Sequence, residues 1–334
     1  MRDERRALGG GGAGTEAAPV VVLVCGEVRT CLLSTSRTLA GAEAERLLRL
    51  RSGDRVRVGT RPLPYALSAD VLTGVDCQLP AASGARIRAV GTVSARAVLT
   101  GGRILQSSAR VALPATGDPE RSPWGRHLAE PGIVRPFGRL PAEDVADGWL
   151  SASQRPGELA LGAVAERLLT DVFRQPELDH QPPFKTRSTR LRWAALRTTT
   201  GTGPVLESLT IEADGLLTVR LRQPAEPESA DSAALAGFCE DLALHDWLLT
   251  TLVAMIDRSR LGSADDRVAL RVLRPAVGHL LHLWMPAAHL DPELEPLWAT
   301  LEREPGFSRQ WHVLAQRIRD HLALPGLMSG EAAR

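Results

Sequence analysis

The sequence predicts an α+β protein with a β-rich N-terminal half, built on long antiparallel hairpins, and a helical bundle at the C-terminus. Before about residue 225, apolar runs and alternating stretches are bounded by glycine and proline, which is typical of strands. Beyond it, apolar residues recur every three or four positions, which is typical of helices. The chain has 334 residues, of which 44% are hydrophobic and 24% charged, so it can bury more than one core.

The first predicted unit is a β-rich domain over residues 19–115, preceded by a charged and glycine-rich arm at 1–18 that we expect to be disordered. Residues 20–25 have the apolar run of a buried strand, and residues 38–50 have the pattern of a short helix. Residues 87–99 and 105–113 alternate in polarity around Gly101 and Gly102. This pattern predicts a long β-hairpin with one packed face and one face in water.

The next two units are less regular. Residues 116–157 are rich in proline, glycine and charge, which predicts an irregular connector, and its Trp124, Phe137 and Trp149 suggest that it packs onto the body. Residues 158–225 are predicted to form a mixed α/β segment. Apolar residues from 161 to 172 mark an amphipathic helix, and the Asp214-Gly215 pair marks a second hairpin.

Residues 226–325 are predicted to form a bundle of four or five helical segments, followed by a flexible tail at 326–334. The first helix is expected over 230–260, and Pro275 is expected to kink or split the second. Asp291 followed by proline has the residues of a helix N-cap and first position. Ser308 is expected to cap the last helix.

Charge, cysteines and motifs exclude several classes of function. The formal net charge of +1 provides no long-range field for nucleic acid or a membrane, and no apolar run is long enough to span a bilayer. The four cysteines lack zinc-site spacing and fit reduced thiols of a cytoplasmic protein. The chain also lacks a Walker motif, a G-x-S-x-G motif and an H-E-x-x-H motif. Catalytic residues and cofactors therefore stay unknown, and a non-enzymatic protein is favoured.

His245 occupies a position in the 235–256 helix where the apolar spacing calls for a hydrophobic residue. Asp241 lies one turn before it, and His279 and His282 lie one turn apart further along the chain. Two antiparallel helices could bring the four together as ligands of zinc or a similar metal. The alternative, which we favour, is a buried structural histidine bonded to Asp241 or to a neighbouring helix.

Two further sets of residues are candidate binding surfaces. Cations interleaved with aromatic residues, in a stretch without acid, could hold phosphates and stack a base, although a solvated strand face is the favoured interpretation: Lys185, Arg187, Arg190 and Arg192, flanked by Phe184 and Trp193. Trp284, Met285 and Trp298 could form an exposed surface for a protein partner, although core packing is the simpler interpretation.

Several strings resemble an uncharacterised family from Streptomyces and related actinobacteria: GEVRTCLL at 26–33, YALS at 65–68, AVGTVSARAVLTGG at 89–102, CEDLALHDWLLTTL at 239–252, HLWMP at 282–286 and PGFSRQW at 305–311. Members of that family are encoded beside a variant P-loop protein and a SAM-dependent methyltransferase, and it has no established catalytic residues. The resemblance implies a cytosolic actinobacterial protein that acts within a multi-protein system. We expect a non-enzymatic accessory or scaffold protein that binds another component of that system. A metal-assisted enzyme and a nucleic-acid or nucleotide binder remain the alternatives.

Overall fold

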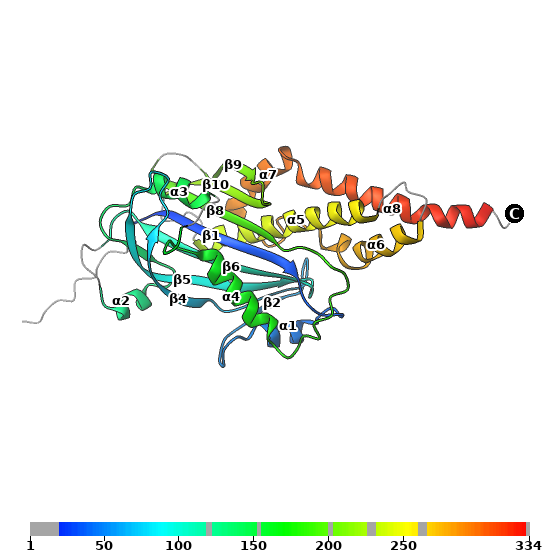
Figure 1. Cartoon of the computed structure of the whole chain (residues 1–334), viewed down its shortest axis with the longest axis horizontal. Helices are drawn as coiled ribbons and strands as arrows, with labels where there is room; N and C mark the ends of the chain where they lie inside the picture. Colours follow the sequence, from blue (N-terminus) through cyan, green and yellow to red (C-terminus); the bar gives the residue numbers. More distant parts are fainter. Residues whose placement is uncertain are drawn as a thin grey trace, which may run out of the picture.

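A mixed ten-stranded sheet with helices on both faces forms the centre of the protein (Figure 1). The structure, a computed structural model, describes residues 20–117, 122–151, 155–199, 203–225, 232–259 and 266–331, with the side chains of 266–268 and 323–331 left aside. Strand order along the sheet is β2-β3-β5-β6-β1-β8-β10-β9, and β4 and β7 pair with β5. Strands β8 and β10 run parallel, whereas the other pairs are antiparallel. The α+β class is thereby confirmed.

The strands are β1 (Val21–Leu32), β2 (Arg57–Gly59), β3 (Tyr65–Leu67), β4 (Val71–Leu79), β5 (Ile87–Thr100), β6 (Ile104–Pro114), β7 (Val134–Pro136), β8 (Thr189–Thr198), β9 (Val205–Ile211) and β10 (Leu216–Pro224). The helices are α1 (Gly41–Leu48), α2 (Trp124–Ala129), α3 (Ala142–Leu150), α4 (Leu161–Phe173), α5 (Ser232–Ser259), α6 (Asp266–His279), α7 (Glu295–Arg303) and α8 (Phe307–Glu331). Two short 3-10 turns, η1 (Leu281–Leu283) and η2 (Pro292–Leu294), lie between α6 and α7.

The long strands β5 and β6 pair antiparallel around a turn in which Gly101 and Gly102 both have positive φ, at 59° and 62°. The expectation that one face of this pair lies in water is wrong. Arg96 on β5 and Gln106 on β6 are 6% and 2% exposed, because α5 covers the face to which they belong. Both side chains bond to α5, so their polar groups are satisfied by that helix instead of by water.

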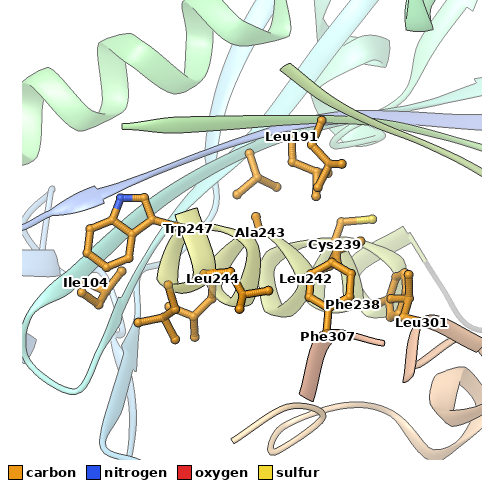
Figure 2. Packing of buried hydrophobic residues seen from close by; sticks show 14 of the residues in the cluster. Ile104, Leu191, Phe238, Cys239, Leu242, Ala243, Leu244, Trp247, Leu301 and Phe307 are labelled. Atoms are coloured by element: carbon orange, nitrogen blue, oxygen red, sulfur yellow. The ribbon is translucent and has the colours of Figure 1, made fainter. Parts of the chain in front are cut away.

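Two hydrophobic cores lie on opposite sides of the sheet. On one side, α5 places residues such as Phe238, Leu242 and Trp247 against the strands, and Leu301 and Phe307 close the same core from α7 and α8 (Figure 2). On the other side, α1, α3 and α4 contribute the helical residues of the second core. Helix α5 is therefore sandwiched between the sheet and the remaining C-terminal helices.

The sheet joins regions that the sequence suggested were separate. Strand β8, from the expected mixed segment, pairs directly with β1 of the expected β-rich domain. The expected irregular connector contains α2, β7 and α3, and Trp149 at its end is buried, with its indole donating to the carbonyl of Trp193 at 3.0 Å. The expectation of an irregular connector is therefore wrong over these three elements. Trp149 packs into the body as expected, whereas Trp124 is 41% exposed.

The C-terminal helices follow most of the expected signals. Asp291 caps η2 by accepting a hydrogen bond from the Glu293 N–H, as its sequence context predicted. Pro275 lies inside α6, which continues to His279. The prediction for Ser308 is wrong, because α8 begins at Phe307 and the Ser308 hydroxyl and N–H both donate to Glu302. The expected arm at 1–18 lies outside the described residues, and α8 runs to Glu331 in place of most of the expected tail.

None of the helices in the described ranges is both long and apolar enough to cross a membrane.

Candidate functional site

His245 is a core residue, as favoured from the sequence. Its side chain is fully buried, and its Nδ1 donates to the backbone carbonyl of Asp241 at 2.7 Å. The ring lies edge-on against Trp284 and Trp298, with centroid distances of 4.7 and 5.3 Å. No hydrogen-bond partner for its Nε2 occurs in the described part of the chain. An aromatic enclosure of this kind supports a packing role.

The predicted convergence of Asp241, His245, His279 and His282 is not formed. Among the described residues, which include all four, no group of three or more His, Cys, Asp or Glu side chains is arranged to hold a metal ion. His279 stacks on Phe184 instead, at a centroid distance of 6.2 Å. The pKa values of His279 and His282 are lowered by partial burial and by the positive charge of Arg103, which also disfavours a cation beside them.

The four cations of the basic segment at 185–192 lie in different surroundings. Lys185 and Arg187 are exposed before β8, whereas Arg190 donates to Asp214 at 2.5 Å. Arg192 is 4% exposed, pairs with Glu27 at 3.3 Å and lies over the Trp149 ring. Since two of the four cations are neutralised by carboxylates within the fold, these observations count against a continuous phosphate-binding strip.

The three residues of the predicted partner surface do not lie on one exposed face. Trp298 is 5% exposed and belongs to the core beside α5. Trp284 is half-buried and stacks on Trp311 at a centroid distance of 4.4 Å. Met285 is 40% exposed. The two tryptophans therefore serve the packing of the C-terminal helices, which was the simpler interpretation.

A surface groove of about 410 Å³ lies between the second half of α5, the first turns of α8 and the sheet edge at β9. Its walls are mainly apolar: Leu209, Ile211, Leu217, Leu249, Val253, Ala254, Pro305, Phe307 and Leu314. Ile211 and Val253 are 72% and 42% exposed, so apolar surface continues out of the groove. We call this feature the α5–α8 groove. It combines an apolar lining with a strand at the edge of a sheet, where partners commonly bind.

Among the described residues that line the α5–α8 groove, the charged ones, Asp246 and Asp257, are both negative. Neither forms an ion pair or hydrogen bond through its side chain with any described residue. Burial raises the pKa of Asp246 to about 6, because its carboxylate is partly withdrawn from water without a compensating donor. A cation beside the Asp246 carboxylate would offset that cost.

The signal for this groove was present in the sequence of α5. Asp246, Thr250, Val253 and Asp257 follow one another at spacings of four, three and four, which places them on one helical face. The apolar stripe that includes His245 dominates the pattern of this helix, and the neighbouring face carries no motif that would mark a site. Only the arrangement of α8 and β9 beside that face makes it a groove.

A buried ion pair joins the sheet to α5 and was also not predicted. The Arg96 guanidinium donates from Nε and Nη2 to the two carboxylate oxygens of Glu240, both at 2.7 Å, and each residue is 6% exposed. Arg96 also donates to the carbonyl of Ala233 at 3.3 Å. This bidentate geometry positions the first half of α5 on β5.

No protein-family model, no curated protein and no solved structure matches this chain.

Proposed function

We propose that this protein is a non-enzymatic accessory protein that binds a partner protein in the α5–α8 groove. The partner contributes an amphipathic segment that presents apolar side chains together with at least one lysine or arginine. The observation that carries the proposal is the pair of carboxylates, Asp246 and Asp257, which have no side-chain partner among the described residues and lie in a mainly apolar groove. Such a site is complementary to a basic amphipathic segment and not to an acidic one.

Each part of the groove has a role in this interaction. The exposed side chains of Ile211 and Val253 would pack against the apolar residues of the segment, where burial supplies most of the affinity. Asp246, which is half-buried, would receive the cation and so select the partner's sequence and register. Asp257, which is exposed, would steer the approach of the segment more than it would hold it.

Site-specific photo-cross-linking in the native host tests the proposal. A benzophenone amino acid replaces Val253 in the groove, and the matched control carries it at Val58 on β2, because both side chains are 42% exposed. We expect a protein to be captured from position 253 and not from position 58. Sequencing of the cross-linked peptide should show lysine or arginine among apolar residues.

The charge requirement is tested in the same assay with the Asp246→Asn and Asp257→Asn double variant. Loss of one partly exposed ion pair at Asp246, of about 0.5–1 kcal/mol, should reduce affinity for the captured protein about 2- to 5-fold, and loss of Asp257 should mainly slow association. Equal capture at both positions, an acidic cross-linked peptide, or undiminished capture by the double variant would reject the proposal.

A further inference from the structure

A second cavity, of about 390 Å³, lies at the other end of α5 from the α5–α8 groove. It is enclosed by the first half of α5, the strands β2, β3 and β5, and the segment around residues 285–291. Leu63, Val98 and Leu244 are among its apolar lining residues. We call it the β2–α5 pocket. Its volume is within the range of small-molecule sites.

The floor of the β2–α5 pocket is built from the Arg96–Glu240 ion pair. Both oxygens of Glu240 are occupied by Arg96, so the two charges neutralise each other and leave no net charge at this point. Gln106 beside them donates to the carbonyl of Glu240 at 2.8 Å and to the hydroxyl of Thr30 at 3.1 Å. A floor with this many internal bonds is rigid and preorganised for a ligand.

Two hydrogen-bond donors, Arg57 and Tyr65, line the pocket. Arg57 is exposed, and neither an ion pair nor a hydrogen bond links its side chain to any residue within the described ranges. The Tyr65 ring lies 4.3 Å from that of His289, centroid to centroid. On its other side it lies over Gly59, where a Cβ atom would come within 2.1 Å of the ring. Tyr65 is therefore held between β2 and His289 in the lining of the pocket.

Two carboxylates complete the site. Asp241 lines the pocket, and one carboxylate oxygen accepts the Ala287 N–H at 2.8 Å, while the other has only the His245 Nδ1 near it, at 3.6 Å. Burial raises the pKa of Asp241, whereas His245, the Ala287 N–H and His289 oppose that shift. Asp291 is a second carboxylate in the lining. The pocket thus holds charged groups of both signs, and one oxygen of Asp291 also caps η2.

We propose that the β2–α5 pocket binds a small zwitterion with an apolar body, of the amino-acid class. Its carboxylate would be held by Arg57 and Tyr65, its ammonium group by Asp241 with Asp291, and its side chain by the apolar wall. An anion alone would give Asp241 no cationic group to bind, and a cation alone would give Arg57 no carboxylate to bind. Only a ligand with both charges satisfies both sets of groups.

Calorimetric titration of the full chain with three probes that share a phenyl group tests this inference. The probes are L-phenylalanine, 3-phenylpropionate, which lacks the ammonium group, and 2-phenylethylamine, which lacks the carboxylate. We expect phenylalanine to bind at millimolar concentration or below, and each single-charge probe to bind at least tenfold more weakly. Equal binding of either single-charge probe, or no binding of phenylalanine, would overturn the proposal.

Two variants place the binding in the pocket. Arg57→Gln removes the carboxylate partner and should weaken phenylalanine at least tenfold, whereas Arg55→Gln, an exposed arginine outside the lining, should have no effect. Gly237→Leu should block the pocket, because a Cβ atom there meets only Arg96, at 3.8 Å, and the longer side chain extends into the cavity. Phenylalanine binding that survives both Arg57→Gln and Gly237→Leu would show that the site lies elsewhere. This outcome is independent of the cross-linking result at Val253.

Discussion

Breaking the Arg96–Glu240 pair should be among the most costly single changes in this protein. Glu240→Gln replaces one of the two acceptor oxygens with an amide NH2 that would face an Arg96 N–H, and it leaves the guanidinium charged and 6% exposed. Two unit charges about 4 Å apart attract by about 4 kcal/mol at an effective dielectric constant of about 20. Removing one partner of a buried pair typically costs about 3–5 kcal/mol, and we expect this loss in the free energy of unfolding.

The exposed pair Arg88–Asp76 supplies a matched control. It has the same bidentate geometry, with Nε and Nη2 donating at 3.0 and 3.1 Å, but its side chains are 61% and 26% exposed. Asp76→Asn should therefore cost less than about 1 kcal/mol in urea denaturation. The double variant Arg96→Met with Glu240→Met should cost less than either single change, because no charge stays buried. If Glu240→Gln costs no more than Asp76→Asn, the reasoning about burial is refuted.

Three further predictions concern α5. His245→Ala should lower the free energy of unfolding by about 2–4 kcal/mol, because it opens a cavity between Trp284 and Trp298. His245→Asn should lower it less. The control His282→Ala, at an exposed position, should stay within about 0.5 kcal/mol of the parent in the same thermal melt. The pKa of Asp246 is raised from 3.8 to about 6, so its ionisation destabilises the fold as pH rises through this window. Asp246→Asn should accordingly be more stable by about 1–2 kcal/mol near pH 8, with the gain vanishing toward about pH 4; an equal gain at both pH values would contradict the assignment. Gly237→Ala should stabilise the protein by about 0.5–1 kcal/mol, since it removes glycine from a helix interior with room for the methyl group. A lower stability of this variant in thermal unfolding would show that the pocket wall tolerates no added atom.

The candidate sites could be predicted only in part. The burial of His245 followed from its place in an apolar stripe, because helical periodicity fixes which residues share a face. The metal cluster did not form, because α6 ends at His279 and His282 lies in the separate turn η1, so the expected helix carrying both histidines is wrong. The pairing of Arg192 with Glu27 could not be foreseen, because the two residues are brought together by the adjacency of β1 and β8.

By itself, the sequence determined the local structure of this protein. It determined the class, the position of α5, the glycine turn between β5 and β6 and the cap at Asp291, because alternation, helical spacing and turn chemistry act within a few residues. Only the tertiary structure decided that β1 and β8 share one sheet, that the polar face of β5 is buried beneath α5, and that Asp246 and Asp257 line a groove. Those features arise from contacts between residues far apart in the chain, where the relative placement of whole elements, and not local periodicity, decides which side chains meet.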